Sequence, residues 1–451
     1  MQTEDQMIPT DAKDDSIIKP FILEFPLSPI FEMNQLQQKL IADGKKIYKF
    51  GFGQSPFGPP KCMIDELAAH AHEKDYLHVQ GLLPLRQEIA RFYEKYTKYP
   101  ISPENVVVGP GSIENLFVFQ QVFNGNLITP NPTWVSYGPQ AKLAGNKHYW
   151  IEAYKDGEFE FNCQQFDETL TKLAGQKNYL FLTYPNNPMG ITIGREKLKE
   201  IASIARRHGC YVVSDEIYSE QSFIEEGHTS ISEFYPERTI VSNGISKWLG
   251  AGGWRIGFFI VPSGMRPLID AMNMYNSEMC SGVASPIQYG TVKGFEDTQE
   301  MTDYFANTKK ILLTLSTMFR RTLDEAGIVC TKTGELGSYY ILLDFTNQPK
   351  TAALKAKFEK LDDKNITISR MVQDMMIEED GVAMLAASAF GLPEDRLFFR
   401  LSFADFHGDT LLAKVAAGEE ITEEFCLSNC ATMFEGLQVL IKWWTEKEVV
   451  A

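Results

Sequence analysis

The sequence lacks the features of a membrane-spanning or exported protein. Its 451 residues contain no run of eighteen apolar residues, and a membrane helix needs about that many. Residues 1–16 are polar and acidic and lack the basic start and apolar stretch of a signal peptide. We therefore expect no membrane association, and we interpret residues 1–16 as a mobile acidic tail.

Cysteine and histidine are scarce and show no metal-binding spacing. The seven cysteines include no Cys-x-x-Cys pair, and Cys426 and Cys430 are merely one helical turn apart. An odd number of scattered cysteines indicates reduced thiols and a cytoplasmic protein. His70 and His72 are two residues apart, which is wrong for one helical face. We expect no bound metal.

Basic residues are also fewer than acidic residues. The chain has 43 lysines and arginines against 59 acidic residues, a net charge of -16. This balance argues against nucleic acid as a partner and against binding to anionic membranes. The chain is 44% hydrophobic and has no solenoid repeat, so we expect a globular protein with room for two domains.

One lysine stands in a setting suited to covalent chemistry. Lys247 lies in SNGISKWLGAGGWRIGF (242–258), and Arg255 follows eight residues later. A lysine amine forms a Schiff base only when it is deprotonated and close to an aldehyde, and small neighbours let a flat ring approach the backbone. The stretch fits a pyridoxal phosphate site; taken alone, it also fits an ordinary surface turn.

Two upstream segments place polar groups where strands end. The apolar run 179–183 leads into the turn YPNNPMG (184–190), which contains Asn187. The strand-like run 211–213 delivers Asp215, with Tyr218 three residues further on. In open α/β sheets ligands bind outside the carboxyl ends of the strands, so these groups are expected at one place.

Each of these three residues also has a simpler interpretation. Asp215 is compatible with a helix N-cap after a strand, Asn187 with a turn residue before Pro188, and Tyr218 with a packed aromatic.

In their order and spacing, the segments resemble the fold-type I pyridoxal-phosphate enzymes, and within them the class I/II aminotransferases of the aspartate aminotransferase superfamily. The resemblance runs from about residue 28 to residue 404. It implies an α/β fold with a mostly parallel seven-stranded sheet in a large domain, plus a smaller α+β domain. The implied division is 17–60 for the N-terminal arm and part of the small domain, 61–298 for the large cofactor-binding domain, and 299–451 for the rest of the small domain.

The resemblance also implies roles around the cofactor ring. Lys247 would form the Schiff base to pyridoxal 5'-phosphate, and Asp215 would pair with the pyridine nitrogen; both would be catalytic. Tyr218 and Asn187 would bind the phenolic oxygen of the ring. A carboxylate beside the ring nitrogen favours its protonated form, which makes the ring an electron sink.

The cofactor phosphate is expected at a helix start. VVVGPGSIENLFVF (106–119) is typical of a strand, a glycine turn and a helix. The backbone amides of Gly111, Ser112 and Ile113 would open that helix and bind an anion, and the Arg255 guanidinium would join them. An ordinary strand-to-helix turn is the alternative.

Two positions near the phosphate depart from the family pattern. Relatives often carry a polar or basic residue where this chain has Ile113, and a serine where it has Gly244. Ser242 or Ser246 could supply the missing contact.

Two aromatic residues match further family positions. Trp134, in NPTWVSYGP (131–139), would stack on the cofactor ring; a core tryptophan is the alternative. Tyr76 matches the tyrosine that reaches the phosphate of the neighbouring subunit. A homodimer with shared active sites is therefore part of the prediction.

Substrate binding is expected at Arg400. In FFRLSFA (398–404) this arginine would hold the α-carboxylate through a planar fork, and an internal salt bridge is the alternative. Gly53 would let the backbone approach the substrate, although Gln54 replaces the usual acidic residue after it. Asn187 would also contact the substrate.

The implied activity is transfer of an amino group between an L-amino acid and a 2-oxo acid. Aspartate and glutamate are candidate donors, but the second cation that an acidic side chain needs is not located in MYNSEMCSGVASPIQ (274–288). The alternatives are a lyase or synthase on the same scaffold and a non-enzymatic ligand sensor.

One segment is longer than the corresponding connection in the aminotransferase family. DFHGDTLLAKVAAGEEITEE (405–424) separates Phe403 from a helix expected near 423–444. We interpret it as a plain surface loop or a lid element.

Overall fold

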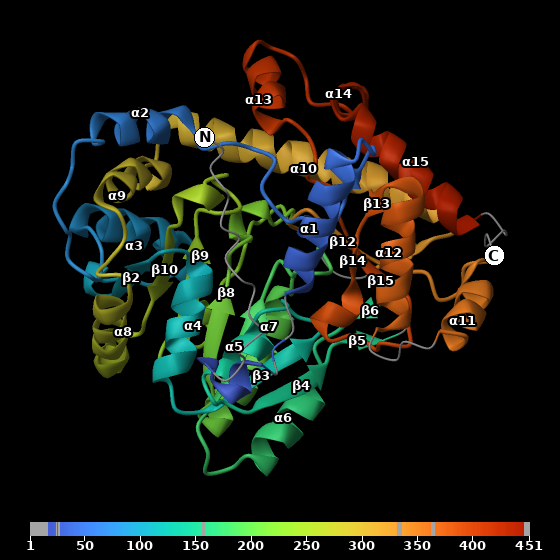
Figure 1. The fold of residues 1–451 in the computed structure, drawn as a ribbon. Helices are drawn as coiled ribbons and strands as arrows, with labels where there is room; N and C mark the ends of the chain where they lie inside the picture. The colour runs from blue at the N-terminus through green and yellow to red at the C-terminus, as the bar shows by residue number, and fades with distance from the viewer. Residues whose placement is uncertain are drawn as a thin grey trace, which may run out of the picture.

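The computed structural model describes residues 17–23, 25, 28–155, 158–331, 336–361 and 366–445. The predicted acidic tail at residues 1–16 lies outside these residues. Two main sheets and the helices around them make up the fold (Figure 1).

The larger sheet has seven strands in the order β2-β10-β9-β8-β7-β3-β4. β10 runs antiparallel to both of its neighbours, and every other pairing is parallel. The prediction of an α/β fold with a mostly parallel seven-stranded sheet is therefore confirmed. The strand bounds are Val106–Gly109 (β2), Asn126–Asn131 (β3), His148–Glu152 (β4), Asn178–Thr183 (β7), Tyr211–Asp215 (β8), Thr239–Gly244 (β9) and Gly257–Ile260 (β10).

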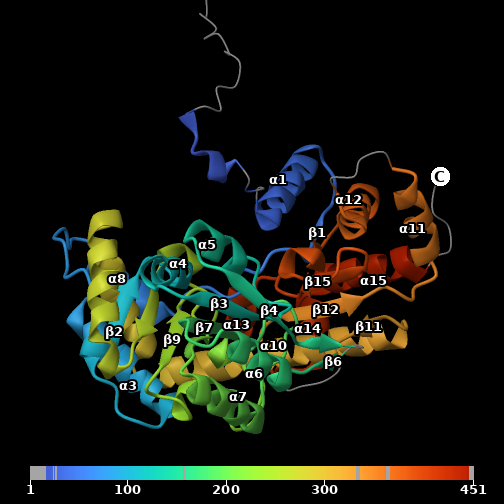
Figure 2. The ribbon, with the colours of Figure 1, turned by 90° about the horizontal axis from the view of Figure 1, so that it is seen from below.

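The central strands are continuous apolar runs because helices cover both faces of the sheet. In β7, Leu180 and Leu182 pack on one face against α6 and α7, while Tyr179 and Phe181 pack on the other against α4, α5 and α8. Figure 2 shows the sheet lying between these helix layers. The helix bounds are Ser112–Val122 (α4), Tyr137–Leu143 (α5), Cys163–Lys172 (α6), Arg195–His208 (α7) and Arg266–Met279 (α8).

Three further helices pack together beside the β2 edge of the sheet, at the left of Figure 1. They are Lys61–Ala69 (α2), Leu83–Thr97 (α3) and Ser285–Val292 (α9).

A second, antiparallel sheet has the order β11-β12-β15-β14. Its strands are Val329–Cys330 (β11), Tyr340–Asp344 (β12), Leu385–Ala386 (β14) and Phe398–Ser402 (β15). The short strands β1 (Tyr48–Lys49) and β13 (Val382–Ala383) pair in parallel, and β5 (Tyr154–Lys155) pairs with β6 (Glu158–Phe159). The accompanying helices are Pro29–Ala42 (α1), Gln299–Glu325 (α10), Thr351–Glu359 (α11) and Ile368–Asp380 (α12).

The interpretation of residues 405–424 as a plain loop is wrong. The segment contains α13 (Gly408–Ala416), whose Leu411 is buried. Apolar residues at helical spacing, Leu411, Leu412 and Val415, pack against the main core, and this burial stabilises the helix. The helix expected near 423–444 is broken at Cys430 into α14 (Glu423–Asn429) and α15 (Ala431–Thr445).

The described residues include neither a membrane-spanning helix nor a metal-binding cluster. No helix between residues 17 and 445, the undescribed gaps aside, is long and apolar enough to cross a bilayer. The same ranges hold no group of three or more histidine, cysteine, aspartate or glutamate side chains placed to bind a metal ion.

Candidate active site

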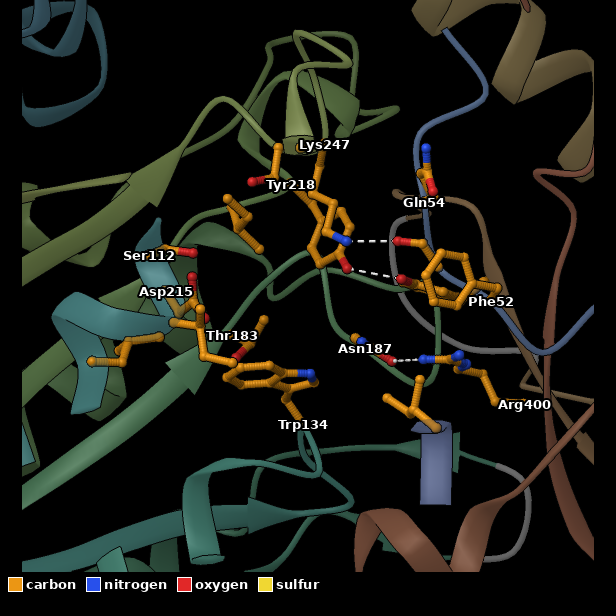
Figure 3. A pocket seen from close by; sticks show the side chains of 18 of the residues that line it. Phe52, Gln54, Ser112, Trp134, Thr183, Asn187, Asp215, Tyr218, Lys247 and Arg400 are labelled. Carbon is orange, nitrogen blue, oxygen red and sulfur yellow. Dashed lines mark hydrogen bonds between the residues drawn. The ribbon is translucent and has the colours of Figure 1, made fainter. Parts of the chain in front are cut away.

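One cavity of about 500 Å³ brings together ten of the twelve predicted site residues. It lies at the carboxyl ends of β7, β8 and β9, where Asp215 is paired with Thr183 on one side and Ser242 on the other. The predicted residues that line it are Gly53, Ser112, Ile113, Trp134, Asn187, Asp215, Tyr218, Lys247, Arg255 and Arg400. Figure 3 shows this pocket.

Lys247 reaches into the pocket from the loop after β9. Its Nζ donates a hydrogen bond to the carbonyl oxygen of Gly53 at 2.6 Å, and the hydroxyl of Tyr339 donates to the same oxygen at 3.0 Å. Desolvation lowers the pKa of Lys247, and the charges of Arg400 and Arg255 lower it further, against opposing contributions from Tyr340 and Asp215. A lowered pKa favours the neutral amine that Schiff-base chemistry requires.

Asp215 lies at the end of β8 and is almost completely buried. Its Oδ2 accepts a hydrogen bond from the hydroxyl of Tyr137 at 2.5 Å, and that hydroxyl also lies 2.5 Å from Thr183 Oγ1. Its Oδ1 is buried without a hydrogen-bond partner among the described residues. Burial raises the pKa of this carboxyl to about 6. A protonated ring nitrogen would satisfy this oxygen and return the carboxyl to its charged form.

The start of α4 is shaped to admit an anion. The first amides of a helix have no partner within the helix, and α4 begins at Ser112. Gly111 precedes it with a φ of 103°, and a Cβ there would lie 2.1 Å from Arg255 Nη2. Only glycine lets the arginine come this close.

The Gly111 amide, which was expected to bind the cofactor phosphate, already has a hydrogen-bond partner. The Gly111 amide donates to the carbonyl oxygen of Gly109 at 2.7 Å. The helix therefore offers the amides of Ser112 and Ile113, while Gly111 contributes its conformation. Arg255 is held by hydrogen bonds to the carbonyl oxygens of Gly252 (2.8 Å) and Pro110 (3.3 Å).

The two serines considered as replacements for a contact at Gly244 lie in different places. Ser246 lines the cavity. Ser242 is completely buried within β9 and is not among the lining residues. Ser246 is therefore the better placed of the two.

Arg400 enters the pocket from β15 of the second sheet. Its side chain is buried, with hydrogen bonds from Nη1 to Asn187 Oδ1 (3.1 Å) and from Nη2 to the Gly51 carbonyl oxygen (2.5 Å). Its guanidinium also lies over the rings of Tyr340 and Phe390. Both acceptors are neutral oxygens, and no carboxylate of the described residues forms a salt bridge with Arg400. The internal ion pair that was the alternative for Arg400 is therefore not found there. A buried cation paired only with neutral groups favours an anionic ligand.

Aromatic side chains enclose the site. The Tyr218 hydroxyl lies 2.9 Å from the Tyr340 hydroxyl, and a Cβ on Gly53 would come within 2.0 Å of that same Tyr340 oxygen. Trp134 is half-buried, packs edge-on against Tyr137, and lies near Thr183 in Figure 3.

Several lining or supporting residues were missed by the sequence analysis. Tyr137 is the first residue of α5, and Trp134 lies in the turn before it, so helical spacing does not link the two residues. Tyr339 and Tyr340 carry no local signal either, because their partner Gly53 lies 286 residues from Tyr339. Phe52 also lines the cavity.

Two predicted residues lie outside the cavity lining. Gly111 borders it through Ser112, the next residue. Tyr76 lies on the loop after α2, which ends at Ala69, and is 91% exposed.

The chain is similar to known aminotransferases in sequence and in fold. Residues 45–415 match the family model of aminotransferase class I and II. The chain is 28% identical over 379 residues to an aspartate aminotransferase of Bacillus subtilis, covering 81% of this chain and 89% of that protein. It is 27% identical over 369 residues to aromatic-amino-acid aminotransferase 2 of Thermococcus litoralis, covering 79% and 87%. In fold it is similar to an aspartate aminotransferase of Thermus thermophilus, with a TM-score of 0.77, 21% identity, and coverage of 94% and 99%.

Proposed function

This chain belongs to the class I and II aminotransferase family, and we propose how the residues of its cavity carry out pyridoxal-phosphate-dependent amino-group transfer. The enzyme moves an amino group between an amino acid and a 2-oxo acid. The observation that carries the residue roles is the convergence of Lys247, the unpartnered oxygen of Asp215 and the buried Arg400 on one cavity.

The residues of the cavity fit the cofactor. Asp215 would hold the ring nitrogen, the amides of Ser112 and Ile113 with Arg255 would hold the phosphate, and Trp134 would lie against the ring. Asn187 uses its amide oxygen for Arg400, which leaves its amide nitrogen to donate to the phenolic oxygen. When bound, pyridoxal phosphate supplies an aldehyde that takes up the amino group and a ring that delocalises the electron pair left on the α-carbon.

The protein's own groups then bind and move protons. Arg400 holds the substrate α-carboxylate and so fixes the α-carbon relative to Lys247. The neutral amine of Lys247 would accept the α proton at Nζ and carry it as the proton donor for the later half of the reaction. Asp215 keeps the proton on the ring nitrogen throughout. The net result is that one amino acid leaves as its 2-oxo acid and a second 2-oxo acid leaves as an amino acid.

Replacement of Lys247 tests these roles. Lys247→Ala should still bind the cofactor through Asp215, Arg255 and α4, because these contacts do not involve the lysine. Its transamination rate should fall by several orders of magnitude, since the variant lacks both the Schiff base and the proton carrier. Lys197→Ala, which removes a surface lysine paired with Glu160 and Glu200, is the matched control. Near-normal turnover by Lys247→Ala would disprove the proposal.

Product analysis separates transamination from the other chemistry considered for this scaffold. A lyase releases ammonia and forms pyruvate without an acceptor. A ligand sensor turns nothing over. An aminotransferase consumes one 2-oxo acid for each one it forms.

We also propose a homodimer with shared sites. Tyr76 is 91% exposed and lies outside the cavity of its own chain. Large apolar side chains are exposed on the neighbouring elements α2, α8 and the start of α3, as expected of a subunit interface. They are Ile64, Leu83, Met274 and Met279.

Three broader assignments complete the proposal. The seven cysteines all lie among the described residues and form no disulfide there, which supports a cytoplasmic location. The strands of the larger sheet fall between residues 106 and 260, which supports a large domain over 61–298. The second sheet, with its strands between 329 and 402, supports a small domain built from 17–60 and 299–451.

A further inference from the structure

The wall of the cavity that faces the substrate is apolar. Phe52 lines the cavity with 44% of its surface exposed, and Ile113 does so with 40% exposed. Ile30 of α1 and the Tyr340 ring continue this wall. Exposed apolar surface inside a cavity becomes favourable when an apolar ligand covers it.

Phe52 lines the cavity between the two groups proposed to hold the ends of the amino acid. Figure 3 shows Phe52 between Lys247 and Arg400, beside Gln54. An amino acid held by its carboxylate at Arg400 and by its amine near Lys247 would therefore direct its side chain along Phe52.

The positive charges in the cavity all have other roles. Among the described lining residues the cations are Lys247, Arg255 and Arg400. The proposed function assigns them to the amine, the phosphate and the α-carboxylate. A second carboxylate on the substrate would lose its hydration against the apolar wall without gaining an ion pair, which is costly.

We infer that this enzyme prefers amino acids with large uncharged side chains, aromatic or aliphatic, over aspartate and glutamate. The inference rests on the proposed function, because it takes the α-carboxylate to bind Arg400. Gln54 is the neutral polar group at the same wall, where a hydroxyl, amide or indole N–H of the side chain could form a hydrogen bond.

Two measurements on the holoenzyme test the inference. The first is kcat/KM for phenylalanine, leucine, alanine, aspartate and glutamate with one fixed 2-oxo acid. Burying a large apolar side chain is worth about tenfold to a hundredfold in binding, so phenylalanine and leucine should exceed both acidic donors by at least about tenfold. The second is the Kd, by calorimetry, of two unreactive acids, 3-phenylpropanoate and succinate, of which 3-phenylpropanoate should bind more tightly.

Two substitutions of Phe52 test whether the apolar wall of the cavity causes the substrate preference. Phe52→Ala should lower the ratio of kcat/KM for phenylalanine to that for alanine by about tenfold. Phe52→Lys should raise the ratio for aspartate to alanine, because it adds the missing cation. Phe31→Ala is the control: Phe31 has a similar exposure of 51% but does not line the cavity, and the ratios should stay unchanged.

The outcomes distinguish this inference from the proposed function. A preference for aspartate or glutamate, or tighter binding of succinate, would overturn the inference and leave the aminotransferase assignment standing; it would point to a cation supplied by the second subunit. If no amino acid reacts, the proposed function fails, and the two unreactive acids still decide the chemistry of the wall. Should Phe52→Ala not fold, the wild-type measurements decide alone.

Discussion

Nη1 of Arg400 lies 3.1 Å from Oδ1 of Asn187, and this contact joins the two sheets at the proposed substrate site. Arg400 comes from β15 of the antiparallel sheet, whereas Asn187 lies in the turn after β7 of the parallel sheet. The guanidinium also donates to the Gly51 carbonyl oxygen. Three separate segments therefore fix the orientation of one planar cation.

Arg400→Lys should impair substrate binding without loss of cofactor. Lysine keeps the charge but loses the planar fork that matches a carboxylate. Losing one charge-assisted hydrogen bond costs about 1.5 to 3 kcal/mol, so kcat/KM for amino acids should fall roughly tenfold to a hundredfold. A primary amine without a carboxylate should be much less affected. Steady-state kinetics with the two substrate types checks this, and an unfolded variant or unchanged amino-acid kinetics would indicate a structural role for Arg400.

Asp215 should make the cofactor-free protein less stable as the pH rises from about 4 to about 6. Its folded pKa is about 6, above the usual value of about 3.9, so the folded state binds the proton more tightly. The stability that this proton provides is present at low pH and is lost as the pH rises toward 6, by an amount on the order of 3 kcal/mol.

Asp215→Asn isolates this contribution. Asparagine does not titrate, so the apoprotein variant should be more stable than the wild-type apoprotein at pH 8, with the difference shrinking toward pH 4. Denaturant unfolding of both proteins across this range measures the difference directly. The same variant should bind cofactor more weakly, since it has no carboxylate for the ring nitrogen. A stability difference that does not change with pH would show that Asp215 does not titrate as described.

Tyr76 should act on the active site of the neighbouring subunit. Tyr76→Phe should weaken cofactor retention without unfolding the chain, because it removes one donor to a phosphate oxygen. If a severely impaired Tyr76 variant is mixed with Lys247→Ala chains, each hybrid dimer has one site with both Lys247 and Tyr76. Random exchange should therefore restore about a quarter of the wild-type activity, as half of the dimers are hybrids with one intact site each.

A matched mixture provides the control. Tyr76→Phe/Arg255→Ala chains mixed with Lys247→Ala chains build no site that has both Lys247 and Arg255, so their hybrids should stay inactive. If the first mixture fails to regain activity although hybrids are shown to form, Tyr76 does not act across the interface.

Asp409 should hold the segment that carries Gly53 and Gln54. Its Oδ1 accepts a hydrogen bond from the Gly58 amide at 2.6 Å, and the Gly408 amide donates to the Pro56 carbonyl oxygen at 2.9 Å. Asp409→Ala should lower kcat/KM by about threefold to tenfold through loss of this charge-assisted bond, with cofactor content unchanged. Amide hydrogen exchange should increase at residues 53–58.

The exposed pair of Asp270 with Arg266 offers a comparison. Asp270→Ala removes a surface carboxylate of the same type, and an isolated surface pair contributes little. Equal effects of the two substitutions on exchange at 53–58 would show that α13 does not hold this segment.

Local chemistry in the sequence determined much of the site. Apolar runs that end in polar residues predicted strands and their functional ends, because parallel strands place their carboxyl ends at one sheet edge. That reasoning brought Asn187, Asp215 and Tyr218 to the same place, and the family resemblance added Lys247 to them. The turn glycines before Ser112 likewise predicted the start of α4.

Only the tertiary structure decided the contacts between distant segments. Tyr339 and Lys247 share the Gly53 carbonyl oxygen, and Tyr340 approaches Gly53 so closely that a Cβ would not fit. Neither phenol has a local pattern that marks it as part of the site. The helix in residues 408–416 depends on burial of Leu411 against a core assembled from remote elements. Periodicity and turn chemistry describe neighbours in the chain, whereas the lining of this cavity depends on how two sheets pack against each other.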